Sequence, residues 1–332
     1  MKHQLHCLLR LLTIMLSTHL AASITPASDS THLKEVIFSG DALGEVWLCG
    51  GQSNMVMPVS YASDVGADLF STPFDIRFFA NGHWRKVDSS NVRDLPAVPF
   101  FFALERYRVT GKPVGIIVAA EGGTGIEAWV PTVAMPETAI GHKMRTLSNA
   151  PEVIEAARLD RAETMRPYGQ HRLAQWGLGR AYPSELYQKK VLPLEGTPIT
   201  GIIWYQGENH AGSHAFAAEY DAWLQGLIAS WRKLFGEVPF LIVELPHYKP
   251  PTSSNELRAA QKRCADSVKA TFLVPAFDLG DENDIHPKRK RAMGERIAQF
   301  IQKNLKTEIG IFYEHHHCQT TPRLVPHPSK RT

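Results

Sequence analysis

Apolar residues in this chain occur in short unbroken runs, and they seldom alternate with polar ones. Runs of this kind, bounded by glycine or polar residues, are typical of strands buried on both faces of a parallel sheet. The sheet is therefore expected to have helices on both sides. The runs predict strands at residues 45–49, 74–79, 114–119, 199–205, 239–244 and 271–277.

Helical patterns lie between these strands. From residue 216 to 234 large apolar side chains recur every three or four positions, and Gly236 stands where a C-terminal cap belongs. Helices are also predicted over 98–107 and 288–305. The Lys-Arg run 288–291 is expected to form a solvated face of the last helix. The alternation of strands and helices predicts an α/β fold with a parallel sheet.

The segment from residue 131 to 183 breaks this alternation, because it holds several arginines and no strand-like run. We expect it to be an insertion. In parallel α/β sheets the ligand crevice lies beyond the carboxyl ends of the strands. The insertion is expected to border that crevice.

Composition and charge exclude several classes of protein. The chain has 332 residues, of which 44% are hydrophobic and 21% charged, as in ordinary globular proteins. The net charge of +3 comes from basic residues near the two ends, so the central part is close to neutral. This excludes a nucleic-acid footprint. No apolar run reaches the length of a membrane span, and no basic membrane patch is seen.

The first residues resemble an export signal. Residues 1–10 are mildly basic, residues 11–16 form a short apolar run, and residues 20–23 supply small residues for cleavage. This order predicts a signal peptide at 1–23 and a periplasmic or secreted protein; a helical or disordered N-terminus of a cytoplasmic protein is the alternative. The end of the chain, residues 314–332, is expected to be a disordered tail.

A serine follows the first predicted strand in the run Gly50-Gly51-Gln52-Ser53-Asn54-Met55. Such a serine, held on a tight turn, points its hydroxyl into the crevice. If a helix begins there, free backbone N–H groups favour an oxyanion at the same place. The competing interpretation is a serine that only caps a helix.

Three further segments follow later strands. Residues 121–129 contain the Gly122-Gly123 pair, whose backbone can approach a substrate closely. Asn209, after the fourth strand, offers an amide donor. His286 lies among carboxylates in residues 278–287, an arrangement that suits a general base. The alternative interpretation of the two glycine-containing segments is an ordinary turn. The alternatives for residues 278–287 are a solvated acidic loop and a metal site.

Together the segments 51–55 (GQSNM), 122–129 (GGTGIEAW), 204–209 (WYQGEN) and 284–287 (DIHP) resemble the sialate O-acetylesterase and acetyl-xylan-esterase branch of the SGNH hydrolases. The resemblance runs from about residue 43 to 305 and implies a carbohydrate esterase domain at 35–308. It implies a three-layer α/β/α sandwich with a flavodoxin-like parallel sheet of about five strands. It also implies an O-acetylated carbohydrate as substrate and no metal or other cofactor.

Site residues follow from the same resemblance. It implies Ser53 as nucleophile and His286 as base. The backbone N–H of Ser53, the pair Gly122 and Gly123, and the Asn209 amide are implied as oxyanion donors. Four further motif residues are predicted to contact the substrate: Gln52, Gln206, Glu127 and Trp129.

The position of the triad acid departs from the family pattern, because many SGNH enzymes carry an aspartate three residues before the histidine. That position is Asn283 here. We favour Asp284 as the acid, with Asp281 in reserve, and a Ser-His dyad stays open. Two rivals to the esterase also remain. A non-catalytic glycan-binding protein would not react with a serine-directed phosphonate, and a metal-dependent hydrolase would be silenced by a chelator.

Overall fold

The computed structural model describes residues 44–305, apart from 68, 70–72, 164–170 and 250–251. The predicted signal peptide at 1–23 and the predicted tail at 314–332 lie outside the described residues. The helices and strands reported below all fall within the predicted domain at 35–308.

One seven-stranded sheet forms the centre of the molecule, in the order β3-β2-β4-β1-β5-β6-β7. Neighbouring strands run parallel except for the β2–β3 pair. The predicted parallel sheet is therefore confirmed, with more strands than the resemblance implied. The strands are β1 (Glu45–Gly51), β2 (Ile76–Ala80), β3 (His83–Lys86), β4 (Val114–Ala120), β5 (Gly201–Tyr205), β6 (Phe240–Val243) and β7 (Thr271–Val274).

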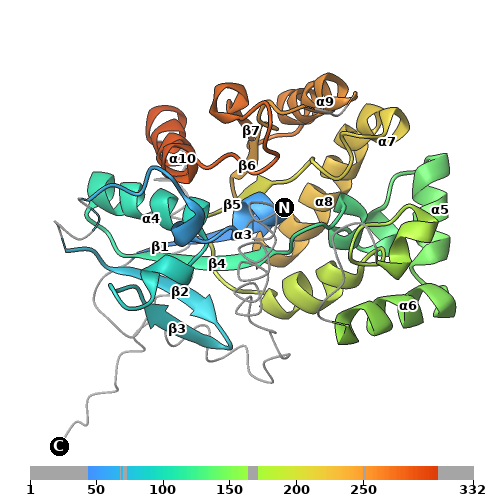
Figure 1. The fold of residues 1–332 in the computed structure, drawn as a ribbon, viewed down its shortest axis with the longest axis horizontal. Helices are drawn as coiled ribbons and strands as arrows, with labels where there is room; N and C mark the ends of the chain where they lie inside the picture. Colours follow the sequence, from blue (N-terminus) through green and yellow to red (C-terminus); the bar gives the residue numbers. More distant parts are fainter. Residues whose placement is uncertain (1–43, 68, 70–72, 164–170, 250–251, 306–332) are drawn as a thin grey trace, which may run out of the picture.

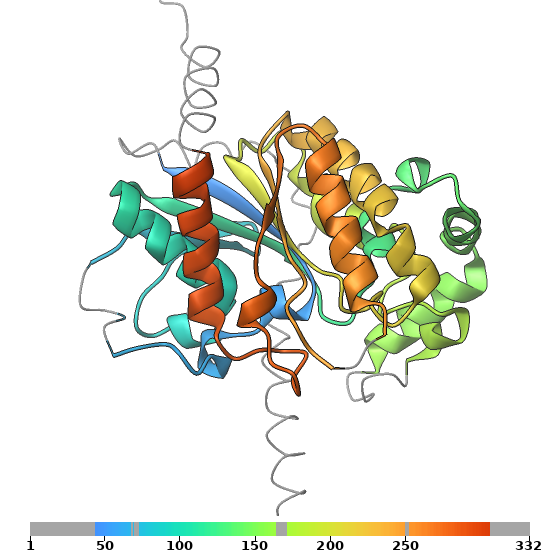
Figure 2. The same ribbon diagram turned by 90° about the horizontal axis from the view of Figure 1, so that it is seen from above.

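Helices cover both faces of the sheet and make three layers (Figure 1). Seen from above, α4 and α10 lie on one side and α8 and α9 on the other (Figure 2). The helix predicted at 216–234 is split into α7 and α8 at Glu219. The α-helices are α3 (Ser53–Val56), α4 (Ala97–Thr110), α5 (Ala139–Leu147), α6 (Pro151–Ala162), α7 (His214–Ala218), α8 (Tyr220–Phe235), α9 (Ser254–Ser267) and α10 (Lys290–Asn304).

Shorter helical turns complete the connections. They are η2 (Val59–Tyr61), η3 (Val92–Asp94), η4 (Ile126–Trp129), η5 (Thr132–Ala134), η6 (Arg172–Trp176), η7 (Tyr187–Val191), η8 (Leu192–Leu194) and η9 (Phe277–Leu279). Most of them lie in loops that follow a strand. They therefore shape the rim of the sheet on which the predicted site residues lie.

Strand β1 explains why the apolar runs do not alternate. Every residue of β1 is buried. Val46 and Leu48 belong to the apolar core on one face of the sheet, and Trp47 and Cys49 to the core on the other. Because successive side chains of a strand point to opposite faces, a strand covered on both sides is apolar along most of its length. The exception in β1 is Glu45, whose buried carboxylate pairs with Arg106.

The strand order creates a switch point beside β1. After β1 the chain continues toward β2 on one side of the sheet, and after β5 it continues toward β6 on the other side. Diverging connections at neighbouring strands leave a crevice at their carboxyl ends. The turn after β1 holds Ser53, and the turn after β5 holds Asn209.

The predicted insertion at 131–183 contains α5 and α6 and the turn η6. Its apolar side chains, among them Met144, Val153 and Leu173, belong to the same buried cluster as residues of the sheet and of α8. The insertion is therefore part of the main core. Its far end, residues 179–180, contacts the loop after β4.

Candidate active site

Ser53 is the first residue of α3 and directly follows the turn after β1. Gly51 has a φ of 138°, and a Cβ built there would lie 2.1 Å from the Tyr205 carbonyl oxygen of β5. Only glycine tolerates both the left-handed backbone and this close approach. The Gln52 N–H then donates to the same carbonyl at 3.2 Å. The turn that carries Ser53 is thus fixed against the neighbouring strand.

His286 reaches Ser53 across the crevice. Its Nε2 lies 2.8 Å from the Ser53 Oγ, within hydrogen-bond distance. Burial is the main cause that lowers the pKa of His286 to about 4, the charge of Lys290 lowers it further, and Asp284 acts in the opposite direction. The imidazole is therefore neutral at neutral pH, and its nitrogen is available to accept the serine proton.

Asp284 contacts the backbone of His286. Its Oδ1 accepts the His286 N–H at 2.8 Å, and its Oδ2 accepts the Tyr61 hydroxyl at 3.1 Å. The same hydroxyl lies 3.0 Å from the His286 carbonyl oxygen. Asp281 accepts the Asn283 N–H at 2.9 Å. The hydrogen bonds described for Asp284 thus fix the loop of the histidine. Tyr61, on η2, is a further contact of this loop that sequence reasoning did not find.

The predicted oxyanion donors gather around the loop after β4. A Cβ built on Gly122 would lie 3.5 Å from the Ser53 Cβ, so Gly122 is directly beside the serine. Gly123 has a φ of 75°, which favours glycine. A Cβ on Gly179 would lie 2.6 Å from the Gly123 carbonyl oxygen and 3.1 Å from the Asn209 Nδ2. Gly179, which the sequence reasoning missed, is thus where the insertion meets both segments.

The four predicted substrate contacts are buried. Gln52, Gln206, Glu127 and Trp129 are between 0% and 2% exposed. The Gln206 amide donates to the Gln52 Oε1 at 3.1 Å and to the Thr124 carbonyl oxygen at 3.2 Å. These side chains therefore connect the loops after β1, β4 and β5 from within.

Trp129 and Glu127 make similar internal contacts. The Trp129 Nε1 donates to the Thr124 Oγ1 at 3.1 Å. A Glu127 carboxylate oxygen lies 3.0 Å from the His210 Nε2. In this structure both side chains hold the loop after β4, and their polar atoms face protein groups.

A buried polar cluster lies behind the serine. Lys290 Nζ donates to the Asn54 Oδ1, and the Asn54 Nδ2 donates to a Glu208 carboxylate oxygen. The side chains of Lys290, Asn54 and Glu208 are 1%, 1% and 6% exposed. The expectation that residues 288–291 form a solvated face is therefore wrong for Lys290. Its side chain points inward at the start of α10, because a carboxylate and an amide there compensate its charge.

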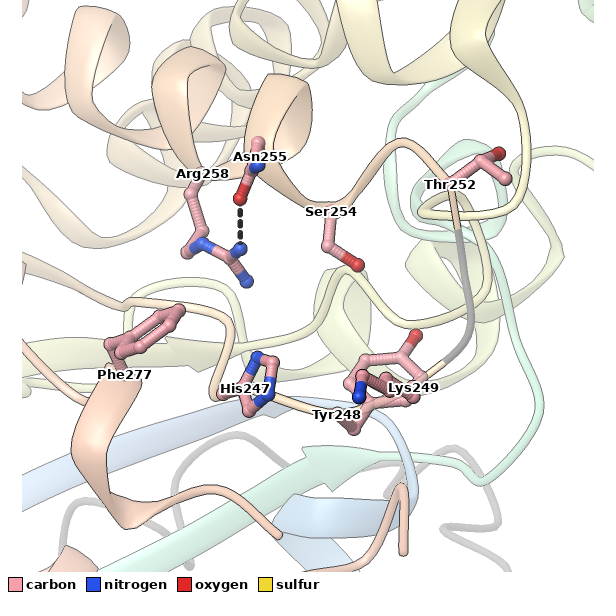
Figure 3. A pocket seen from close by; sticks show the side chains of 8 residues that line it. All are labelled: His247, Tyr248, Lys249, Thr252, Ser254, Asn255, Arg258 and Phe277. Carbon is pink, nitrogen blue, oxygen red and sulfur yellow. Dashed lines mark hydrogen bonds between the residues drawn. The ribbon is translucent and has the colours of Figure 1, made fainter. Parts of the chain in front are cut away.

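A surface pocket adjoins this region, between the segment after β6 and the start of α9 (Figure 3). Two of its lining residues contact each other: the Arg258 guanidinium lies over the Phe277 ring, 4.9 Å from the ring centre. The Tyr248 hydroxyl donates to the Glu208 carbonyl oxygen at 3.3 Å, which ties the pocket wall to the loop of Asn209. The predicted site residues are not among those that line it.

The described residues contain no group of three or more His, Cys, Asp or Glu side chains that could hold a metal ion. The acids and the histidine of residues 278–287 thus do not converge as ligands. Instead they bond to backbone groups of their own loop or to other protein side chains.

Among the described helices, none has the length and apolar character of a membrane span.

Comparison with known proteins supports the resemblance. Residues 167–303 match the model of a family described as carbohydrate esterase, sialic acid-specific acetylesterase. The chain is 27% identical to rat (Rattus norvegicus) sialate O-acetylesterase in an alignment that covers 79% of this chain and 58% of the rat protein. It is 25% identical to the human (Homo sapiens) enzyme in an alignment that covers 80% of this chain and 55% of that protein.

A solved structure agrees with these matches. A carbohydrate acetylesterase from Xanthomonas citri superposes with a TM-score of 0.61 and 27% identity, covering 78% of this chain and 56% of that one. The chain thus spans little more than half the length of these relatives. The predicted resemblance to the carbohydrate acetylesterases, in sequence and in fold, is confirmed.

Proposed function

We propose that this chain, a relative of the carbohydrate acetylesterases, is a serine esterase that removes O-acetyl groups from carbohydrates. The observation that carries the proposal is the 2.8 Å contact between Ser53 Oγ and His286 Nε2. A serine hydroxyl becomes a nucleophile when a neutral imidazole accepts its proton. The low pKa of His286 keeps that imidazole neutral.

The reaction proceeds in two steps. Ser53 Oγ attacks the acetyl carbonyl carbon while His286 takes its proton, and the bond between that carbon and the sugar oxygen then breaks. The sugar oxygen leaves as an alcohol with the proton from His286. In the second step water attacks the acetyl-serine while His286 takes its proton. The bond between the acyl carbon and Ser53 Oγ then breaks, His286 returns the proton to Oγ, and acetate is released.

Charge on the carbonyl oxygen is stabilised by hydrogen-bond donors. We assign this role to the Ser53 N–H, to a backbone N–H of the Gly122–Gly123 pair and to the Asn209 amide. The close approach of Gly122 to Ser53, and of Asn209 to the loop of Gly123 across Gly179, support the assignment. In other acyl-transfer enzymes one such donor lowers the activation barrier by about 3–4 kcal/mol.

The role of Asp284 is to orient the base. Its bonds to the His286 N–H and to Tyr61 restrict the loop, and its negative charge favours the imidazolium that forms during the reaction. We assign Asp284 as the acidic partner on this basis. The Asp281 carboxylate instead accepts the N–H of Asn283, three residues before the histidine. A histidine held mainly through its backbone agrees with a Ser-His pair that Asp284 assists.

The direct test is Ser53→Ala. Acetate release from O-acetylated sialic acid, acetyl-xylan and p-nitrophenyl acetate should fall by more than about 10³-fold, because the nucleophile is lost. Ser60→Ala, which changes an exposed serine on η2, is the matched control and should keep full activity. A fluorophosphonate should label Ser53 in the unchanged protein, as read by peptide mass spectrometry. Full turnover by Ser53→Ala would refute the proposal, and a protein that binds glycans without labelling would instead be the non-catalytic rival.

A further inference from the structure

Lys290 has an unusual position for a lysine. It is the first residue of α10, and its side chain is 1% exposed. A buried ammonium loses its hydration, and a positive charge at the N-terminal end of a helix is opposed by the helix dipole. Neither helix formation nor solubility explains a lysine there. A structural partner for the charge must therefore compensate both costs.

The partner is an amide that belongs to the serine turn. Asn54 is 1% exposed, and its Oδ1 accepts a hydrogen bond from Lys290 Nζ. Its Nδ2 donates to a Glu208 carboxylate oxygen and, at 3.0 Å, to the Ile285 carbonyl oxygen. The amide orientation follows from this chemistry, since its oxygen must face the ammonium and its nitrogen the two acceptors.

Each of these contacts lies one residue from a group of the proposed reaction. Asn54 follows Ser53, Ile285 precedes His286, and Glu208 precedes Asn209. One amide therefore joins the three segments that carry the nucleophile, the base and a side-chain oxyanion donor. These segments are far apart in the sequence, and the Asn54 amide contacts all three of them.

Building on the proposed function, we propose that Lys290 is a positioning residue: through Asn54 and Glu208 it holds Ser53, His286 and Asn209 in register, and its charge acts together with burial against protonation of the imidazole. It does not touch the reacting atoms itself. Loss of alignment by even 1 Å in such a site costs about 10²-fold in rate.

The electrostatics support this role. Burial lowers the pKa of Lys290 to about 7, whereas Glu208, Asp284 and Asp64, which face it from three loops, favour its charged form. Burial also raises the pKa of Glu208. At pH values below about 7 Lys290 is charged, and there it opposes protonation of His286. The groups that act on His286 are thus Lys290 on one side and Asp284 on the other.

The test is Lys290→Met, which keeps the length of the side chain and removes the charge and the donor. We expect kcat for p-nitrophenyl acetate to fall by ~10²-fold with little change in KM. The acid limb of the pH profile of kcat/KM should move to higher pH, because the imidazole is then more easily protonated. Lys290→Arg retains the charge and should retain the position of the acid limb even if kcat falls.

Lys303→Met is the matched control, because it makes the same change at an exposed position of α10. It should leave kcat and the pH profile unchanged. Circular dichroism verifies that each variant is folded, and Lys290→Gln, which keeps a donor for Asn54 without charge, replaces the Met variant if that one is not. A folded, uncharged variant with the kcat and acid limb of the unchanged protein overturns the proposal.

A titration of His286 by NMR, in ¹³C-histidine-labelled protein, separates this inference from the proposed function, because it needs no turnover. If the unchanged protein releases no acetate but Lys290→Met still raises the pKa of His286, the esterase proposal fails and the action of the Lys290 charge on His286 stands. If the unchanged protein is active and the Met variant titrates and turns over as before, only the inference about Lys290 fails.

Discussion

At the scale of the residue, the protonation of His286 decides when Ser53 can be activated. The ring is half-buried between the serine and the start of α10, and this loss of hydration is the first cause that lowers its pKa. A histidine in water titrates near pH 6.5. The base form of His286 therefore persists over a much wider acid range than that of an exposed histidine.

The rate should reflect this shift. The neutral imidazole is the active form, so kcat/KM should stay constant as the pH falls from 7 and should reach half its plateau near pH 4. Acetate release at constant ionic strength, with circular dichroism at each pH to verify folding, measures the profile. A midpoint near 6.5 in folded protein would mean that His286 is solvated in solution.

At the scale of the element, close packing between α4 and α10 holds the serine turn and the start of α10 in place. A Cβ built on Gly294 of α10 would lie 2.6 Å from the Phe102 nitrogen of α4. The first residue of α4, Ala97, donates its N–H to the Met57 carbonyl oxygen at 2.8 Å, at the end of the helix that Ser53 begins. Helix α4 thus connects the serine turn to the helix that starts with Lys290.

Gly294→Ala tests this packing. The added methyl group has no room against the backbone of α4, so the helices must separate, and the free energy of unfolding should fall by about 1–3 kcal/mol. Gly212→Ala, at an exposed turn where a Cβ meets nothing within 4 Å, is the control and should change it by less than about 0.5 kcal/mol. Urea unfolding followed by circular dichroism gives both values. Equal stability of the two variants would contradict the close packing.

At the scale of the whole molecule, the insertion and the sheet share one core. Val153 of α6 is fully buried and belongs to the same apolar cluster as Leu48 of β1 and Trp231 of α8. Residues so connected unfold together when the core is cooperative. We therefore expect the insertion, including the rim at Gly179, to unfold together with the sheet.

Val153→Ala should therefore weaken the entire molecule. Removing two buried methyl groups should lower the free energy of unfolding by about 1–3 kcal/mol, and tryptophan fluorescence and far-ultraviolet circular dichroism should report one shared transition. Val133→Ala, at a side chain that is 92% exposed, should leave the midpoint unchanged. Separate transitions for the two probes would show that the insertion folds on its own.

Local sequence was enough to predict the sheet and the order of the motifs. After its first residue, Glu45, strand β1 carries no polar side chain because it is buried on both faces, and this leaves a signal within about seven residues. The edge strand β3 was missed because His83–Lys86 is short, polar and exposed on one side. The Asn81-Gly82 turn before it, where both residues have positive φ, was the available signal.

Long-range packing alone decided the rest of the site. Nothing in the run Lys288–Arg291 distinguishes the one side chain that turns inward, because its partners Asn54 and Glu208 lie far away in the chain. The approach of Gly179 to Asn209 and the bond from the Tyr61 hydroxyl to Asp284 have the same origin. The residue types of the site were thus determined by the sequence, whereas their partners and protonation depend on burial, which only the assembled fold creates.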